Sequence, residues 1–447
     1  MGLEHQFQLL SELDPIRIEG RVAQVVGLVI ESNGPTARMG EVCLIYASPS
    51  APPILSEVVG FRGERLLLMP LGEMSGIKPG SEVVATGKPF TVGVGDQLLG
   101  RVLDGLGQVI DGGPPVSGLK RVTAENQPPN PLTRERIKTV LPLGVKAIDG
   151  LLTCGRGQRM GIFAGSGVGK STTLGMIARN TEADLNVICL VGERGREVRD
   201  FLERDLGPEG LKRSVVVVAT SDQPALQRLK AAQVATAIAE FFRDQGRDVM
   251  LMMDSVTRFA MAQREVGLAI GEPPATKGYT PSVFAILPKL LERAGTSDRG
   301  SITGLYTVLV EADDFNEPIS DTVRGILDGH IILSRELAAQ NHYPAIDVLN
   351  SVSRVMVEIT SERHQKAAGW LREVLATYRN AQDLINIGAY QKGSNPQIDA
   401  AISFYDPCRE FLRQTVKEQP EFEPTVERLE GLFEPLFTAE AQQAPKF

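Results

Sequence analysis

Apolar and polar residues follow three successive patterns along this chain, and the first one predicts strands. Residues 16–88 contain short runs of β-branched and apolar residues separated by Gly, Pro and Asn turns: IRIEGRVAQVVGLVIES, EVCLIYA, ILSEVVGF, ERLLLMP and SEVVATG. Regular short strands of this kind predict a small barrel. The stretch that follows, 95–136, is rich in Gly and Pro but keeps apolar residues, which indicates an ordered connection.

The second pattern, from 144 to about 358, alternates strand and helix candidates. The strand candidates are almost continuously apolar: RMGIFAG, LNVICLVGE, SVVVVAT, DVMLMMD and ITGLYTVLVE. The helix candidates between them include KSTTLGMIARN, EVRDFLERDL and QRLKAAQVATAIAEFFRDQ. Such alternation predicts a parallel sheet that is covered by helices on both faces.

The third pattern, beyond about 359, is helical. HQKAAGWLREVLATYRNAQDLINIGAY and NPQIDAAISFYDPCREFLRQ predict helices, and the tail from 423 onward is expected to end loosely. At the other end of the chain, Leu3, Phe7 and Leu10 have helical spacing, although so short a helix is marginal alone in water. That segment is either a frayed end or a helix that docks onto a partner.

Composition narrows the class of protein. The chain has 447 residues, of which 42% are hydrophobic and 23% charged, so a packed core is expected. A net charge of −8 and 5% aromatic residues argue against a protein that coats nucleic acid. The four cysteines are far apart and form no C-x-x-C pair, which predicts reduced, buried thiols. No apolar run approaches the ~18 residues of a membrane span, and the first residues lack a signal-peptide pattern. We therefore expect a soluble cytoplasmic protein.

A phosphate-binding loop is the strongest chemical signal in the sequence. AGSGVGKS, which begins at Ala164, follows the strand RMGIF and opens a helix. Glycines let backbone N–H groups close around phosphate oxygens, and the helix N-terminus adds its positive dipole. The usual first residue of this motif is Gly, and this chain has Ala164 there. The predicted nucleotide-binding residues are Gly165, Ser166, Gly167, Val168, Gly169, Lys170, Ser171 and Thr172.

Hydrolysis requires further groups beside this loop. Lys170 is placed to reach the β- and γ-phosphates, and the Ser171 hydroxyl to bind Mg²⁺. Asp254 ends the strand DVMLMMD, where it would hold the water shell of Mg²⁺. Glu193 follows the strand VICLV and is a candidate for polarising the attacking water, although a Glu after a strand is common. Arg354 ends PAIDVLNSVSR and is a candidate for offsetting transition-state charge, although spacing alone favours a surface salt bridge.

Taken together, these segments resemble the hexameric ATPases related to the catalytic subunit of the rotary ATP synthase. Within that family the chain looks most like the flagellar protein-export ATPases, from about residue 17 to 435. The resemblance is carried by GVKAIDGLLTCGRGQRMGIFAGSGVGKS, GERGREVRDF, PPATKGYTPSVFAILPKLLERAG, DTVRGILDGHIILSRELA, PAIDVLNSVS and DLINIGAYQKGSNPQIDAAI.

The resemblance implies an α/β fold and roles for single residues. The fold would be a RecA-like P-loop NTPase core with an N-terminal β-barrel and a C-terminal α-helical domain. Glu193 matches the catalytic glutamate of the family motif GER, and Arg194 follows it on the γ-phosphate side. Asp254 matches the Walker B aspartate, and Arg354 the arginine finger supplied by a neighbouring subunit. Tyr343 matches an aromatic that packs on adenine, or else is a simple core aromatic.

The same resemblance implies domain limits and partners. The implied limits are a docking helix over 1–15, the barrel over 16–92, the ATPase domain over 93–358 and the helical domain over 359–447. Family members hydrolyse MgATP as homohexamers beneath a membrane export gate. They bind a dimeric peripheral-stalk regulator through the N-terminal helix, a coiled-coil stalk protein in the ring pore, and export chaperone–substrate complexes; no nucleic acid partner is implied.

Three alternatives share parts of this pattern. A virulence injectisome ATPase would have the same catalytic residues. A rotary ATPase subunit is the second alternative, and its non-catalytic form would lack the carboxylate of Glu193. A ring-shaped RNA translocase would share the phosphate loop, but the acidic charge and sparse aromatic residues speak against it.

Overall fold

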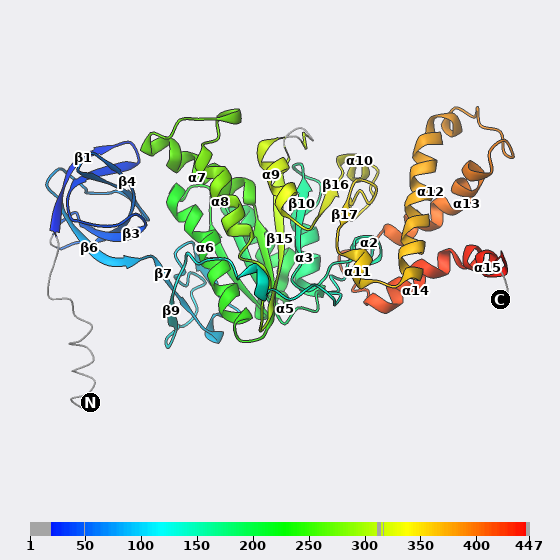
Figure 1. The fold of residues 1–447 in the computed structure, drawn as a ribbon, viewed down its shortest axis with the longest axis horizontal. Coiled ribbons are helices and arrows are strands. Elements are labelled where there is room, and N and C mark those ends of the chain that lie inside the picture. Colours follow the sequence, from blue (N-terminus) through cyan, green and yellow to red (C-terminus); the bar gives the residue numbers. More distant parts are fainter. Residues whose placement is uncertain (1–18, 49, 311–313, 316, 444–447) are drawn as a thin grey trace.

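The computed structural model describes residues 19–48, 50–310, 314–315 and 317–443. Figure 1 shows a barrel, a helix-covered sheet and a group of helices in chain order. The expected docking helix over 1–15 lies outside the described residues. Among the helices within the described ranges, none is long and apolar enough to cross a membrane.

The N-terminal barrel is confirmed as a closed six-stranded structure. Its strands pair in the order β1-β2-β5-β4-β3-β6, and β1 and β6 close the ring. Closure leaves no free sheet edge, which removes a site for unwanted strand pairing. The strands are β1 (Glu19–Val26), β2 (Val29–Asn33), β3 (Glu41–Tyr46), β4 (Ile54–Arg62), β5 (Arg65–Pro70) and β6 (Glu82–Pro89).

The Gly- and Pro-rich connection is ordered, as expected, but part of it belongs to the central sheet. β7 (Thr91–Val94) pairs with β9 (Lys120–Thr123) as a separate two-stranded sheet. β8 (Val102–Asp104) runs parallel to β12 (Ser214–Ala219) at the edge of the central sheet. The sequence analysis did not single out β8 as a strand of the central sheet. Two short 3₁₀ turns, η1 (Asp96–Leu98) and η2 (Pro131–Thr133), complete the segment.

The central sheet has the order β17-β16-β10-β15-β13-β11-β12-β8, with β14 beside β15. All neighbours are parallel except β14 with β15 and β17 with β16. This confirms the predicted parallel sheet. Its remaining strands are β10 (Arg159–Ala164), β11 (Leu185–Val191), β13 (Asp248–Asp254), β14 (Gly295–Thr296), β15 (Ser301–Leu309), β16 (Gly329–Leu333) and β17 (Val352–Ser353).

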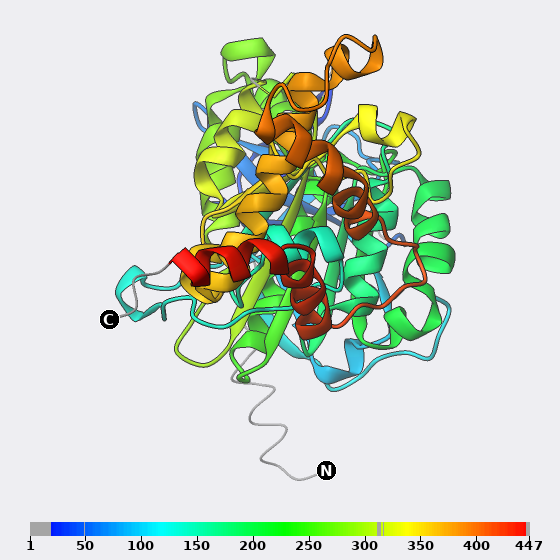
Figure 2. The same ribbon diagram turned by 90° about the vertical axis from the view of Figure 1, so that its right-hand side faces the viewer.

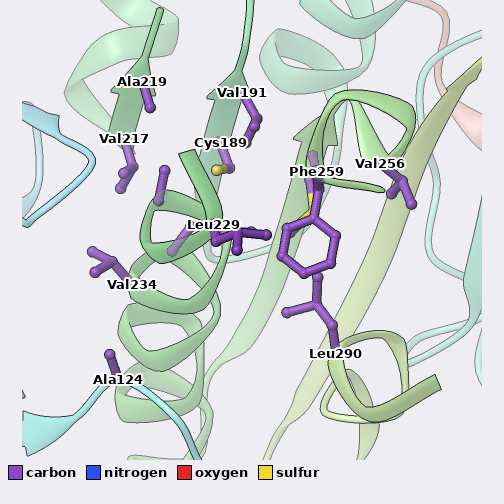
Figure 3. Close-up of a cluster of buried hydrophobic side chains, with 14 of the residues drawn as sticks. Ala124, Cys189, Val191, Val217, Ala219, Leu229, Val234, Val256, Phe259 and Leu290 are labelled. Atoms are coloured by element: carbon purple, nitrogen blue, oxygen red, sulfur yellow. The ribbon is translucent and has the colours of Figure 1, made fainter. Parts of the chain in front are cut away.

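Helices cover both faces of this sheet. They are α2 (Lys146–Leu151), α3 (Lys170–Asn180), α4 (Gly195–Asp200), the π-helical turn η3 (Phe201–Leu206), α5 (Gly207–Lys212), α6 (Ala225–Arg243), α7 (Val256–Ile270), η4 (Thr276–Gly278), α8 (Pro281–Leu291), α9 (Pro318–Ile326) and α10 (Arg335–Ala339). Successive residues of β11 enter opposite cores: Val187 and Cys189 face one, Ile188 and Leu190 the other. Figure 3 shows Leu229, Phe259 and Leu290 packed within the first core. Double-sided burial explains why the strand is apolar throughout.

The C-terminal region is helical, in front of the sheet in Figure 2. Its helices are α11 (Met356–Ile359), α12 (Glu362–Asn386), α13 (Pro396–Leu412), α14 (Phe422–Leu432) and α15 (Glu434–Gln443). The tail that was expected to end loosely is helical up to Gln443, and Leu429 and Phe433 are fully buried against the apolar core shared with Phe411. The last residues, 444–447, lie outside the described part of the chain. All four cysteines are buried and unpaired, as expected.

Candidate nucleotide site

The predicted chemical groups gather at one edge of the sheet because their strands are parallel and in register. Ala164, the end of β10, is level with Leu309 of β15. Asp254, the end of β13, is level with Leu190 of β11. The loops that follow β10, β11 and β13 therefore leave the same carboxyl edge, where ligands bind in open α/β sheets.

The phosphate loop, residues 165–169, leads from β10 into α3. Gly167 and Gly169 have φ values of +80° and +93°, which side chains with a Cβ rarely adopt. Gly169 is the N-cap of α3, and its carbonyl accepts from the Thr173 amide. Val168 is 2% exposed and anchors the loop in the core. The turn directs backbone amides and the helix N-terminus toward one point, which suits an anion.

Ala164 stands outside the part of the loop that needs glycine. It is the last residue of β10, hydrogen-bonded in register with both β15 and β16. Its side chain is 1% exposed and belongs to the core. Because strand geometry is open to any residue with a Cβ, the departure from Gly at this position leaves the loop conformation unchanged.

Lys170 joins the two predicted carboxylates. Its Nζ lies 2.5 Å from Asp254 Oδ1 and 3.5 Å from Glu193 Oε1. Asp254 Oδ1 also accepts from Thr307 Oγ1 at 2.7 Å. Burial lowers the pKa of Lys170, but the two carboxylates more than offset it, so the net shift of that pKa is upward. The structure thus brings together three of the predicted residues around one ammonium group.

Glu193 has the electrostatic character of a group that accepts a proton near neutral pH. Burial raises the pKa of its carboxyl to about 7; Asp254 and Glu197 add to the rise and Lys170 opposes it. A pKa near the working pH is the property that an efficient general base requires. The Glu193 backbone carbonyl accepts from the Ser221 amide at 3.0 Å, which fixes the loop after β11.

The two predicted arginines lie outside this cluster. The Arg194 side chain is 82% exposed and lies 3.4 Å from Glu197 Oε1. Arg354 is exposed and directly follows β17, whose Ser353 pairs with Gly329 at the start of β16. The phosphate loop is at the other end of that sheet, four residues along β16 or roughly 13 Å at the usual strand rise. Arg354 is therefore remote from the phosphate loop of its own chain.

Tyr343 lies beside the phosphate loop and lines a pocket next to it. A β-carbon placed on Gly169 would lie 3.8 Å from Tyr343 Cε1, and the Tyr343 side chain is 43% exposed. It borders an open pocket of about 340 Å³. The other residues that line the pocket are Lys146, Asn341, Glu410, Arg413, Gln414, Thr415, Glu418 and Arg428.

This pocket is built across the junction with the C-terminal helices, and sequence reasoning missed all of its members except Tyr343. The Gln414 amide donates to the Tyr343 carbonyl at 3.0 Å, and Gln414 Oε1 accepts from the Lys146 amide at 2.9 Å. Lys146 Nζ lies 2.8 Å from Glu418 Oε1. Lys146 and Gln414 are 268 positions apart, so no local pattern could have paired them.

The residues present fit a magnesium ion that arrives with a nucleotide. The described part of the chain holds no group of three or more His, Cys, Asp or Glu side chains that could bind a metal alone. Mg²⁺ that bridges phosphates needs only one or two protein oxygens. The Ser171 hydroxyl at the start of α3 and the Asp254 carboxylate supply that chemistry.

Comparisons with known proteins agree with this geometry. Residues 144–353 match the nucleotide-binding domain of the ATP synthase alpha/beta family, and residues 22–87 match its beta-barrel domain. Residues 360–431 match the C-terminal domain of the type III secretion ATPase EscN. The three matched segments coincide with the sheet, the barrel and the C-terminal helices.

Relatives that align over almost the whole chain indicate which branch of the family it resembles. The flagellum-specific ATP synthase of Bacillus subtilis is 60% identical, covering 97% of this chain and 99% of its own length. The type 3 secretion system ATPase of Xanthomonas euvesicatoria is 53% identical over 94% of this chain and 95% of its own length. The assembled ATPase EscN of enteropathogenic E. coli superposes with a TM-score of 0.88 at 48% identity, covering 92% of this chain and 99% of that one.

The fold and the site define a P-loop nucleotide-binding protein. The chain belongs to the ATP synthase alpha/beta family, within its branch of flagellum-specific and type III secretion ATPases.

The phosphate loop gives a first testable prediction. Gly169→Ala places a Cβ at φ +93°, which costs about 1–2 kcal/mol and should weaken ADP binding roughly five- to thirtyfold. Ala164→Gly should leave the affinity within about twofold, because strand geometry needs no glycine. Calorimetric titration with ADP measures both. Equal losses in the two variants would contradict the assignment of Ala164 to the strand.

Proposed function

We propose that this chain is the ATPase of a flagellar type III protein-export apparatus, which hydrolyses MgATP to ADP and phosphate as a homohexameric ring. The observation that carries the proposal is the cluster of Lys170, Glu193 and Asp254 beside the phosphate loop. Family membership supports the reaction, because the relatives are named ATP synthases and ATPases. The 60% identity to a flagellum-specific relative favours the flagellar system.

In the proposed reaction Lys170 exchanges partners. Phosphate oxygens of ATP compete for its ammonium, which now rests on Asp254 at 2.5 Å. Asp254, released from Lys170, would help to hold the Mg²⁺ that arrives with the nucleotide, and Ser171 would contribute its hydroxyl. When bound, Mg²⁺ neutralises charge on the phosphate oxygens. Glu193 accepts the proton of the attacking water, and Lys170 and Arg194 offset negative charge on the transferring group.

The proposed ring supplies a second arginine from the neighbouring subunit. Arg354 is exposed and remote from the phosphate loop of its own chain, which supports its delivery to the γ-phosphate by another copy. An arginine provided in trans stabilises transition-state charge and makes turnover depend on assembly. The solved structure of an assembled EscN, which this chain resembles over 92% of its length, supports a ring.

The family resemblance also supports a residue that contacts adenine and a set of partner proteins. Tyr343 stacks on adenine in the pocket that it shares with Gln414. A second EscN structure contains its central stalk EscO, which supports a coiled-coil stalk in the pore here. The remaining partners are a dimeric peripheral-stalk regulator at helix 1–15, chaperone–substrate complexes and the membrane export gate.

The protein would lie on the cytoplasmic face of the membrane. Its proposed domains cover residues 16–92, 93–358 and 359–447.

Mixing two inactive variants tests the arginine in trans. Glu193→Gln should lower turnover by about 10²-fold or more, and Arg354→Ala by about 10³-fold or more. In a ring assembled from equal amounts of both, up to about one quarter of the interfaces pair an intact Glu193 with an intact Arg354. The MgATPase rate of the mixture should therefore far exceed that of either variant.

The control for mixing uses a doubly substituted chain. Glu193→Gln mixed with Glu193→Gln/Arg354→Ala restores no complete interface and should stay inactive. If the first mixture also stays inactive while both chains co-assemble, Arg354 does not act across the interface.

The raised pKa of Glu193 predicts the pH dependence of turnover. Because the base must be deprotonated, kcat/KM should rise with pH through about 7 and then level off. Glu197 helps to raise that pKa, so Glu197→Gln should move the rising limb to lower pH. Glu209→Gln, which removes an exposed carboxylate 2.7 Å from Lys212, is the matched control. A limb that stays in place in Glu197→Gln would exclude Glu193 as the titrating group.

A host strain separates the flagellar and injectisome systems. Replacing the chromosomal gene with Lys170→Ala should abolish filaments while the protein remains present, because phosphate binding is lost. Intact filaments together with lost effector secretion would assign the chain to an injectisome. Purified wild-type protein that turns over no ATP at any concentration would instead favour a non-catalytic rotary subunit.

A further inference from the structure

A second cavity lies between the central sheet and the C-terminal helices, apart from the phosphate loop. It is more enclosed than the Tyr343 pocket and has a volume of about 80 Å³. One wall is the segment 334–349, which follows β16 and contains α10. The other wall consists of α12 and α13. Nothing in the proposed ATPase reaction uses this cavity.

Two nitrogen-bearing side chains of the cavity lack partners. His342 is 4% exposed, and within the described part of the chain its imidazole has no hydrogen bond. Burial, with the guanidinium groups of Arg413 and Arg409 nearby, lowers the pKa of His342 to about 4, so its ring is neutral. Because His342 lines the cavity, its ring nitrogens can hydrogen-bond a ligand there.

Arg409 brings a guanidinium group to the cavity wall. Its guanidinium has no carboxylate partner among the described residues, although it lines the cavity. The two acidic residues of the lining are already engaged: Asp347 lies 3.5 Å from Arg379 and accepts from Asn350 at 2.8 Å. Glu336 accepts from Gln340 at 3.4 Å. Arg413 and Arg409 both act on His342 as positive charges, so the part of the cavity next to the imidazole favours an anion.

The remaining walls are apolar and set the size of the occupant. They are formed by Leu337, Ile346, Leu375, Leu412 and the stacked rings of Tyr378 and Tyr405. About 80 Å³ is roughly half of the ~150 Å³ that holds a benzene ring in an engineered cavity. The occupant therefore has one anionic end and a short apolar body.

We propose that this cavity binds a small carboxylate whose head pairs with Arg409 and His342 and whose short alkyl body packs on the leucines. The planar guanidinium presents two parallel N–H groups to such a head, and the imidazole N–H supplies a third donor. The occupant touches the segment 334–349 and the helices α12 and α13 at once. It therefore fastens the C-terminal helices to the residue directly before Tyr343, and binding is coupled to the nucleotide pocket.

Ligand-detected saturation-transfer NMR with butyrate on the full-length, nucleotide-free protein tests the site. Butyrate should bind wild type, and Arg409→Gln should weaken binding about tenfold or more. Leu375→Trp, which fills the cavity, should abolish binding. Arg204→Gln removes an arginine that is 77% exposed on η3 and should bind like wild type. Butylamine, with the same body and the opposite charge, should not bind.

Two further measurements locate the site and test its coupling. Saturating ADP should change the affinity for butyrate by no more than about fivefold, because the two pockets are separate and their coupling is reciprocal; competition for one pocket would instead weaken butyrate binding without limit as ADP increases. Butyrate should change the affinity for ATP by about fivefold in wild type and not in Arg409→Gln. Circular dichroism confirms that each variant is folded.

The proposal is overturned by several clear results. These are the absence of butyrate binding to wild type, equal binding by Arg409→Gln or by butylamine, and displacement by ADP. Binding that leaves the ATP affinity unchanged would overturn the coupling. None of these results depends on which secretion system the chain serves.

Discussion

The parallel register of β10, β15, β13 and β11 is the constraint on which the site depends. It brings the ends of strands that are far apart in sequence to one edge, so that Lys170 of one loop meets Asp254 and Glu193 of two others. The register is held because almost all residues of these strands are buried and most of their apolar side chains pack into one of two cores. A slip by one residue would exchange the two faces of a strand and move its loop away from the edge.

The cluster at that edge is electrostatically unbalanced, with one ammonium facing two carboxyl groups in a poorly solvated place. The imbalance is eased because the pKa of Glu193 rises to about 7, so that its carboxyl is only partly charged near neutral pH. The arrangement suits a ligand that brings both negative phosphates and a cation, because the ammonium and the carboxylates can then each find a new partner.

The sequence predicted those elements whose pattern lies within one short segment, and it did not predict those that depend on contacts between distant segments. β10, β11, β12, β13 and β15 were predictable because double-sided burial makes them continuously apolar. β8 and β17 have three and two residues and exist only through pairing with a sheet edge. The helices α14 and α15 lie within the helical domain implied for 359–447, but the sequence analysis did not single them out. Tertiary packing of Leu429 and Phe433, which no local pattern shows, holds this segment in the core.

The same distinction applies to the site. The phosphate loop is contiguous and was readable from the sequence, and it led to Lys170 and Ser171. Glu193 and Arg354 needed the family resemblance, because an acidic residue after a strand and an arginine in a loop are common by themselves. The pocket around Tyr343 and the cavity around His342 could not be predicted, because each is assembled from the central segment and from helices that arrive much later in the chain.

The Tyr343 pocket and the His342 cavity show how the C-terminal helices contact the nucleotide site. Just beyond the end of α13, Gln414 bonds the Tyr343 carbonyl, the Lys146 amide and the Gly144 carbonyl, and so fixes the helix to both sides of the base pocket. His342 faces the other cavity, and Tyr343 is its chain neighbour. A shift of segment 340–349 that narrows the Tyr343 pocket would therefore also change the shape of the His342 cavity. Because α12 and α13 are 25 and 17 residues long, a small rotation at this junction would displace their far ends by more than their near ends. The junction is where binding energy at the phosphate loop can become motion of the C-terminal helices.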